Sequence, residues 1–292
     1  MKKQDLTVLL LLVVLLVVAA VAVAWLLRGG EQEEVISGTG VRVGLVEVKG
    51  VIVESEPIVR RLERFRKDRR IRAIVLRVDS PGGGVAASQE IYEEVRRVRE
   101  WGKPIVCSMG SVAASGGYYI AVGCNKIVAN PGTTTGSIGV IAEIPRVDRL
   151  LKRLGIEIAV IKSGRYKDIG SPYREMKPDE RRLLKEWIDD AYDQFLHTVS
   201  KERGIPADSL RPVADGRVFT GRQAMKLGLV DTLGTLRDAA RLAAKLAGSN
   251  REPSLVRPVT RRVGLWQVLF GKVHSLREFV RPWPKLKYQW AG

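Results

Sequence analysis

The stretch IRAIVLRVDSPGGG, from Ile71 to Gly84, joins an almost unbroken apolar run to three consecutive glycines. A continuous run of this kind predicts a strand that is buried on both faces, as in a parallel sheet covered by helices on each side. The glycines that follow allow backbone conformations closed to other residues and a close approach to a ligand. This one segment therefore predicts a buried sheet with a candidate binding loop at its edge.

Strands and helices are expected to alternate on both sides of this segment. The alternating stretch 41–53 predicts an earlier strand, and helical spacing predicts a helix over 88–101 with Ser88 as its cap. Further strands are expected over 104–110, 126–130 and 156–164, with a Gly/Thr loop at 131–136. Further helices are expected over 115–123, 146–155, 179–202, 221–228 and 236–248. This order predicts an α/β domain with largely parallel strands.

Charge is the most unusual feature of the composition, with a net value of +17 over 292 residues. The excess is spread over helices and loops, and a large share follows residue 250, where Trp266, Trp283 and Trp290 also lie. Basic residues combined with tryptophan favour an anionic membrane surface over a nucleic acid as the partner. A solvated basic tail without a partner is the alternative interpretation.

Cysteine and histidine are too rare for a disulfide scaffold or a zinc motif. Cys107 and Cys124 are interpreted as two small buried hydrophobic side chains, and a bridge between them outside the cytosol is the alternative. His197 and His274 stand alone in the sequence. No metal site is expected.

The uncharged segment Thr7–Leu27 is long enough to cross a bilayer, since about 20 helical residues span a hydrocarbon core of about 30 Å. Lys2 and Lys3 precede it and acidic residues soon follow, which predicts a cytoplasmic N-terminus and an extracytoplasmic remainder. A cleaved signal peptide is the competing interpretation. The expected organisation is a cytoplasmic stretch (1–6), an anchor (7–27), a linker (28–40), a folded domain (41–250) and a basic tail containing tryptophan (251–292).

Ser115 lies in MGSVAASGGYYIA, residues 109–121, among small residues and directly before two glycines. A serine hydroxyl needs a base within hydrogen-bond reach before it acts as a nucleophile, and neither histidine is well placed to serve. A lysine kept neutral by burial is the remaining candidate, as in known Ser-Lys variants of the catalytic triad. Lys167, at the end of an apolar segment and between turns that contain glycine, stands apart from the lysines on charged helical faces.

Acyl transfer also requires backbone N–H groups that stabilise the oxyanion. Gly82, Gly83 and Gly84 follow the buried strand and can supply such groups, and the N–H of Gly116 adds another. A glycine loop of this kind could equally hold a phosphate, but the full dinucleotide fingerprint is absent.

Four segments together resemble the signal peptide peptidase A family of membrane-anchored serine proteases. They are RVDSPGGGVAASQEIYEEV, GSVAASGGYYIA, PGTTTGSIGV and SGRYKDIGSPYR, and the likeness covers residues 41–248. The resemblance implies a Clp protease/crotonase-like α/β fold of repeated ββα units, here preceded by one transmembrane helix. It also implies that Ser115 is the nucleophile and Lys167 the general base. Gly82 and Gly116 then supply the oxyanion hole, and Ser137 orients the lysine.

In its short form this family implies a ring-like homo-oligomer in which Ser115 and Lys167 of one site come from neighbouring protomers. The implied substrates are short hydrophobic peptides, such as signal-peptide remnants, and no cofactor or nucleic acid is implied. The expected activity is therefore that of a membrane-anchored serine endopeptidase.

Two alternative functions are a crotonase-type acyl-transfer enzyme and a catalytically idle membrane scaffold. An extracytoplasmic domain disfavours a coenzyme A substrate, and a scaffold would tolerate the loss of Ser115 or Lys167, both of which are present. The tail is left open, because the apolar stripe over 263–280 could lie on lipid, pack on the domain or enter an active site.

Overall fold

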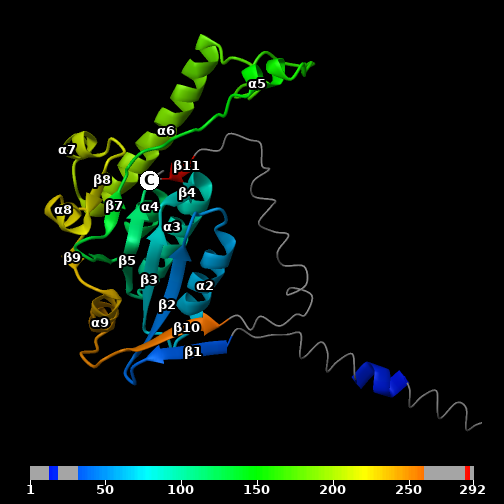
Figure 1. Cartoon of the computed structure of the whole chain (residues 1–292). Helices are drawn as coiled ribbons and strands as arrows, with labels where there is room; N and C mark the ends of the chain where they lie inside the picture. Colours follow the sequence, from blue (N-terminus) through cyan, green and yellow to red (C-terminus); the bar gives the residue numbers. More distant parts are fainter. Residues whose placement is uncertain (1–12, 19–31, 260–286, 290–292) are drawn as a thin grey trace, which may run out of the picture. The chain divides into compact units, whose positions relative to one another are not determined.

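The computed structural model describes residues 13–18, 32–259 and 287–289 (Figure 1). Contacts divide the chain into two compact units, Val35–Val256 with Val280–Gly292 and Met1–Glu34 with Arg257–Phe279. Among the described residues, the main sheet has the strand order β1-β10-β2-β3-β5-β6-β9, with β7 paired to β5 and β8 paired to β7. The α/β class predicted from the sequence is confirmed.

The strands are β1 (Gln32–Ser37), β2 (Arg42–Lys49), β3 (Ala73–Ser80), β4 (Gly82–Gly84), β5 (Ile105–Ala114), β6 (Lys126–Ala129), β7 (Thr134–Gly136), β8 (Val218–Thr220), β9 (Thr232–Leu233), β10 (Ser254–Val259) and β11 (Lys287–Gln289). The helices are α2 (Glu56–Lys67), α3 (Val85–Glu100), α4 (Gly116–Ala121), α5 (Asp148–Arg153), α6 (Pro178–Arg203), α7 (Ala207–Leu210), the 3₁₀ turn η1 (Arg211–Val213), α8 (Gly221–Lys226) and α9 (Leu236–Leu246).

Strand β3 is buried on both faces, as its continuous apolar sequence predicts. Ile74, Leu76 and Val78 belong to the core cluster that includes side chains of α2, α3 and α4. Ala73 and Val75 face the opposite way and belong to the cluster that includes four alanines of α9. Strands β2 and β5 flank β3 in parallel, so the carboxyl ends of all three strands lie at one edge of the sheet.

Most of the elements expected from the sequence are present, but some differ in type or extent. Helix α3 begins at Val85, so Ser88 is not its cap; the Ser88 hydroxyl instead donates to the carbonyl oxygen of Gly84 at 2.9 Å. The loop expected over 131–136 contains strand β7, and helix α2 was not anticipated.

The strand expected over 156–164 is absent, and these residues are irregular and exposed. Their apolar pattern is suited to a strand, but within the described chain no neighbouring strand pairs with them. A strand needs a partner for its backbone hydrogen bonds, which local sequence alone does not provide.

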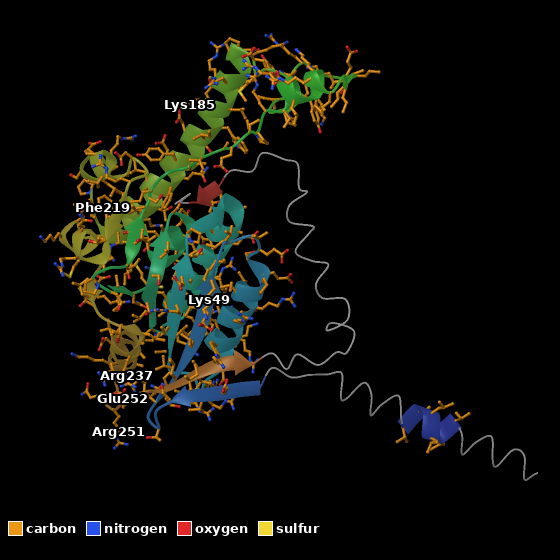
Figure 2. The ribbon with its side chains drawn as sticks, viewed as in Figure 1. Lys49, Lys185, Phe219, Arg237, Arg251 and Glu252 are labelled. Atoms are coloured by element: carbon orange, nitrogen blue, oxygen red, sulfur yellow. The ribbon has the colours of Figure 1, made fainter. Side chains whose placement is uncertain are left out.

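Helix α6 packs against the rest of the domain along only half of its length. Phe195, Leu196 and Val199 are buried in the core, whereas no residue between Arg181 and Asp190 is buried. Ala191 lies thirteen positions after Pro178, which corresponds to about 20 Å of helix. The first half of α6, marked by Lys185 in Figure 2, therefore projects from the sheet together with α5.

The packed end of α6 is tied to the sheet through Asp231. The Asp231 carboxylate accepts from the guanidinium of Arg203 at 2.9 Å and from the backbone N–H of Ile127 at 2.8 Å. Burial alone would raise the pKa of Asp231, but the hydrogen bond and charge of Arg203 outweigh it and hold the pKa below its usual value. The ionised carboxylate therefore joins α6 to β6.

The segment Thr7–Leu27 lies outside the described residues except for 13–18, which are helical and exposed. None of the helices in the described ranges combines the length and the apolar character needed to cross a membrane.

We predict that Asp231→Asn destabilises the domain by about 1–2 kcal/mol at neutral pH, because it weakens a partly buried charged hydrogen bond. A carboxylate with a lowered folded-state pKa stabilises the fold above its unfolded-state pKa of about 3.9, and this stabilisation is lost as pH falls through the folded-state pKa. The difference in unfolding free energy between the two proteins should therefore shrink in acid. Denaturant unfolding at several pH values measures it. The control is Asp189→Asn, which changes an exposed carboxylate on the projecting half of α6; equal pH profiles for both variants would contradict the prediction.

Candidate active site

Ser115 occupies a sharp turn between β5 and α4, where the backbone has φ 55° and ψ −117°. Its side chain is almost entirely buried, with 1% exposure. Among the described residues, Ser115 and Ser137 are the only non-glycine residues with positive φ. Backbone strain of this kind persists only where the surrounding structure enforces it, and it is concentrated at functional sites.

The pairing of β5 with β7 brings these two serines to neighbouring positions. Ala114 pairs with Gly136, so Ser115 and Ser137 follow directly in register on adjacent strands. The N–H of Ser115 donates to the carbonyl oxygen of Gly136 at 2.8 Å, and the N–H of Ser137 donates to that of Arg217 at 2.8 Å. The family resemblance placed both serines at the site, but their proximity depends on β7, which the sequence pattern did not reveal.

The glycine loop forms strand β4 at the same edge of the sheet. Gly82 has φ 101°, a conformation that favours glycine, and its N–H donates to Ser80 Oγ at 3.1 Å. Ile52 exchanges backbone hydrogen bonds of 2.8 Å with the Gly82 carbonyl and the Gly84 N–H. Because alternate backbone groups of a strand point to opposite edges, the N–H and C=O of Gly83 face the other side of β4.

Helix α4 packs tightly against the residues that precede β4. A Cβ atom at Gly117 would lie 2.9 Å from the carbonyl oxygen of Ser80. Gly116 is the first residue of α4, so its N–H has no partner within the helix. Ser115 and the two predicted oxyanion donors, Gly82 and Gly116, therefore gather at the carboxyl edge of β3 and β5.

The second edge of β4 is covered by the chain's own C-terminal segment. Strand β11 runs antiparallel to β4, with Tyr288 opposite Gly83 and Gln289 opposite Gly82 (Figure 1). An extended peptide thus already occupies the edge of the predicted oxyanion loop. Of the placements left open for the tail, this contact favours entry into an active site for residues 287–289, whereas the apolar stripe over 263–280 lies outside the described residues.

Lys167 lies in the segment between α5 and α6, where its side chain is exposed. The neighbouring Asp168 accepts from Arg174 at 2.7 Å, and Arg174 also donates to Glu180 of α6 at 2.8 Å. These ion pairs tie the segment that carries Lys167 to the projecting end of α6. Within one chain, the structure therefore does not bring Lys167 to Ser115.

The ion pairs with Arg174 favour the charged state of the Asp168 and Glu180 carboxylates. Hydrogen bonds from Arg174 and Lys162 hold the pKa of Asp168 far below its usual range. A hydrogen bond from Arg174 lowers the pKa of Glu180 to about 2, although burial opposes this shift. The network therefore stays ionised, and the segment remains attached to α6, throughout the neutral range.

No alternative base is available to Ser115 within the described part of the chain. The Ser115 hydroxyl has no side-chain hydrogen-bond partner there, and His197 is an exposed residue of α6. His274 lies outside the described residues.

No group of three or more His, Cys, Asp or Glu side chains in the described ranges could hold a metal ion. Both cysteines are free and buried, and burial raises the pKa of the Cys124 thiol beside Cys107.

A buried serine on a strained strand-to-helix turn, next to glycine backbone that pairs with an extended segment, is an arrangement typical of serine hydrolases of the α/β class. Comparison with known families narrows this class. The model of peptidase family S49 matches residues 97–250, and that of Clp protease matches residues 52–134. The chain belongs to peptidase family S49, and it is a serine protease. The mixed α/β sheet is consistent with a Clp protease-like fold.

Curated relatives support the same assignment. A putative protease of Synechocystis is 46% identical over 213 residues, which cover 73% of this chain and 76% of the relative. A putative signal peptide peptidase SppA of Enterococcus faecium is 40% identical, covering 61% of this chain and 52% of the relative. A chloroplastic serine protease SPPA of Arabidopsis thaliana is 33% identical, and the match covers 84% of this chain and 37% of the relative. The predicted resemblance to the signal peptide peptidase A family is confirmed, and the match spans only part of the longer relatives.

We predict that Gly83→Ala abolishes peptidase activity and destabilises the domain, because the new Cβ atom would lie 2.1 Å from the carbonyl oxygen of Ile52. The matched control is Gly84→Ala, where the nearest atom is 3.7 Å from the added Cβ and activity should be retained. Peptide hydrolysis and thermal unfolding of both variants check this prediction. Full activity in Gly83→Ala would show that β4 is not held against Ile52 as described.

We further predict that deleting residues 287–292 raises kcat/KM for a short peptide, because the deletion exposes the edge of β4 that β11 covers. The effect should fall mainly on KM, since the tail competes with substrate and does not alter the reacting groups. Deleting only Ala291 and Gly292 leaves β11 intact and serves as the control. Unchanged or reduced activity after the longer deletion would contradict competition by the tail.

Proposed function

We propose that this protease is an endopeptidase that hydrolyses short apolar peptides, including remnants of signal peptides, with a Ser115–Lys167 dyad shared between neighbouring copies of the chain. The observation that carries the proposal is the buried, strained Ser115 beside a glycine strand that already pairs with an extended segment. The peptidase family supplies the reaction class.

The reaction is acyl transfer in two steps. Neutral Lys167 takes the proton of the Ser115 hydroxyl while Oγ attacks the peptide carbonyl carbon, and the resulting oxyanion accepts from the N–H groups of Gly82 and Gly116. In the structure the Gly82 N–H donates to Ser80 Oγ, so the proposal requires it to exchange this hydrogen bond for one to the oxyanion. The lysine returns the proton to the leaving amine as the C–N bond breaks. Water activated by the same lysine releases the acyl group and restores the Ser115 hydroxyl.

Ser137 is proposed to orient the lysine. Its position beside Ser115 is fixed by the β5–β7 pairing, and it is nearly as buried as Ser115, with 6% exposure. A hydroxyl in this place can accept a hydrogen bond from Lys167 and donate one elsewhere. Ser137 is therefore a positioning residue, and its loss should weaken the dyad without removing the nucleophile.

The substrate is proposed to bind as β11 does, extended and antiparallel to β4. Main-chain hydrogen bonds to a strand edge bind peptides with little regard to sequence, while neighbouring pockets select side chains. Small buried residues flank Ser115 in the chain, namely Ala113, Ala114, Gly116 and Gly117. They place no charged or bulky side chain beside Ser115, which suits an apolar substrate.

A neighbouring copy is proposed to supply Lys167. The segment that carries this lysine is attached to the end of α6 that projects about 20 Å from the packed part of the helix. Large apolar side chains on the projecting part are exposed, among them Leu150, Leu154, Ile161 and Trp187. Their burial against a second copy would stabilise a ring-like homo-oligomer by removing apolar surface from water.

The domain is proposed to stand on the outer face of a membrane, anchored through residues 7–27 with the N-terminus in the cytoplasm. The uncharged length of that segment and the lysines before it support this arrangement.

A crotonase-type acyl-transfer enzyme would not need a serine on a strained turn, and an idle scaffold would not need Ser115 and Lys167 together. No cofactor and no nucleic acid enter the proposed reaction.

We predict that Ser115→Ala and Lys167→Ala each lower kcat/KM for a fluorogenic apolar peptide by roughly 10³-fold or more, because each removes a member of the catalytic dyad. Mixing the two inactive variants under conditions that allow subunit exchange should restore part of the activity, since some sites would then receive an intact serine and an intact lysine. The control is Lys245→Ala, which removes an exposed lysine of α9, away from the projecting segment, and should leave activity unchanged. Full activity in either dyad variant would overturn the proposal, and loss without restoration despite proven exchange would place the dyad within one chain.

A further inference from the structure

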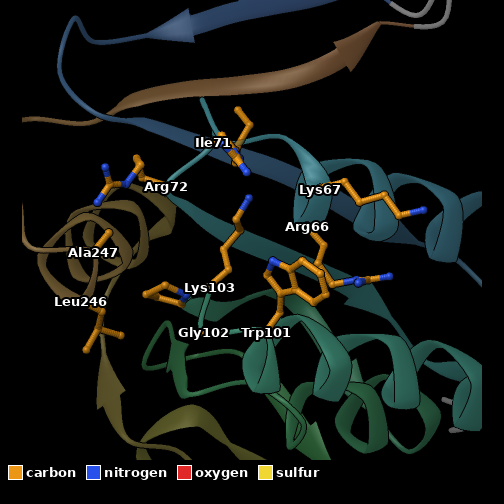
Figure 3. Close-up of a pocket in the computed structure, with 11 residues that line it drawn as sticks. Arg66, Lys67, Ile71, Arg72, Trp101, Gly102, Lys103, Leu246 and Ala247 are labelled. Atoms are coloured by element: carbon orange, nitrogen blue, oxygen red, sulfur yellow. The ribbon is translucent and has the colours of Figure 1, made fainter.

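A basic cavity of about 490 Å³ lies at the edge of the sheet opposite Ser115 (Figure 3). It opens where β3 and β5 begin, between the carboxyl-terminal ends of α2, α3 and α9. The side chains that matter for its chemistry are those of Arg66, Lys67, Arg69, Arg72, Lys103 and Trp101. No carboxylate lines the cavity. Its volume is sufficient for a small ligand.

The positive charge of this cavity is only partly neutralised by nearby acids. Arg66 pairs with Glu94 at 3.0 Å, and Lys67 pairs with Glu63 at 2.6 Å. Within the described chain, Arg69 and Arg72 have no ion pair. Two or more unpaired guanidinium groups around one cavity favour an anion with several oxygen atoms, because each group can donate to it in a forked geometry.

Lys103 stands at the centre of the cavity, between Arg72 and Trp101 (Figure 3). Its ammonium group donates to the carbonyl oxygens of Phe65 at 2.5 Å and Asp68 at 2.8 Å, at the end of α2. Burial lowers the pKa of Lys103 and the charge of Arg72 lowers it further, against the opposing charge of Asp68. The protonated ammonium therefore lies in a partly buried position beside a second cation, which an incoming anion would stabilise.

The rim of the cavity is apolar. Trp101 is 66% exposed and Leu246 is 44% exposed, and the guanidinium carbon of Arg66 lies 5.2 Å from the centre of the Trp101 ring. This cation–π contact holds the ring in place beside the charged groups. A ligand that carries an anionic group next to an apolar portion would match both parts of the surface.

We propose that this cavity binds a phosphate ester, with Arg69, Arg72 and Lys103 holding the phosphate oxygens and Trp101 and Leu246 contacting the adjoining apolar portion. The same phosphate chemistry is offered by a free phosphate compound and by the headgroup of an anionic phospholipid. Strand β3 has eight residues, so the cavity and the catalytic edge are about 26 Å apart and a ligand here would not compete with peptide.

The test measures binding to the full chain in a nonionic detergent by isothermal titration calorimetry. One arm titrates inorganic phosphate, and the other titrates mixed micelles that contain phosphatidylglycerol, with phosphatidylcholine micelles as the blank. Arg72→Gln and Lys103→Met are compared with Arg222→Gln, which removes an exposed arginine on α8 that has no ion pair within the described chain. The basic tail is identical in all variants, so a difference among them isolates the cavity.

The expected result is that Arg72→Gln and Lys103→Met each weaken binding by roughly 10-fold or more, whereas Arg222→Gln does not. If the cavity variants weaken the binding of inorganic phosphate, the proposal is supported and the ligand is a soluble phosphate compound. If they weaken only the binding of phosphatidylglycerol micelles, the proposal is supported and the ligand is a lipid headgroup. Absence of binding in both arms, or equal binding by the cavity variants and Arg222→Gln, would overturn it. Arg72 is exposed, so Arg72→Gln should fold even if Lys103→Met does not.

Discussion

The pairing of β5 with β3 on one side and β7 on the other is the constraint that positions Ser115 at the carboxyl edge of the sheet. β3 is buried between two helical layers, and this burial fixes the position at which β4 leaves the sheet. β7 fixes the end of β5 by the hydrogen bond from Ser115 to Gly136. The strained conformation of Ser115 is sustained because both neighbouring strands are held in place.

The same edge shows why a peptide is a suitable substrate. One side of β4 is bonded to Ile52, and its other side accepts an extended segment, which in this chain is β11. A strand edge of this kind binds an added peptide mainly through hydrogen bonds to the peptide's main chain, and less through its side chains. In the proposed binding mode, substrate and strand β11 pair with the same edge of β4, so the tail should act as a competitor.

Elements with strong local signals could be predicted from the sequence, and those that depend on distant partners could not. The continuous apolar run of β3 and the spacing in α6 each determine the element almost by themselves. β7 has three residues and forms only because β5 and β8 lie beside it, so its sequence looked like a loop. The stretch 156–164 has the pattern of a strand, but none of the described strands pairs with it. At the site, Ser115 was identified by its small neighbours, whereas the position of Lys167 at the far end of α6 depends on the Asp168–Arg174–Glu180 ion pairs, which no local pattern reveals.

A thiol-specific cross-link between two copies tests the shared site most directly. One copy carries Ser115→Cys and the other carries Lys167→Cys, and after mixing, a short bismaleimide can join the new thiols only between chains; the linker spans the length of the lysine side chain, which a direct disulfide could not. The two native cysteines are buried and should not interfere. The proposed arrangement predicts a covalent dimer that contains one copy of each variant. Absence of this dimer, together with an internal cross-link in a single chain that carries both substitutions, would show that Lys167 reaches Ser115 within one chain.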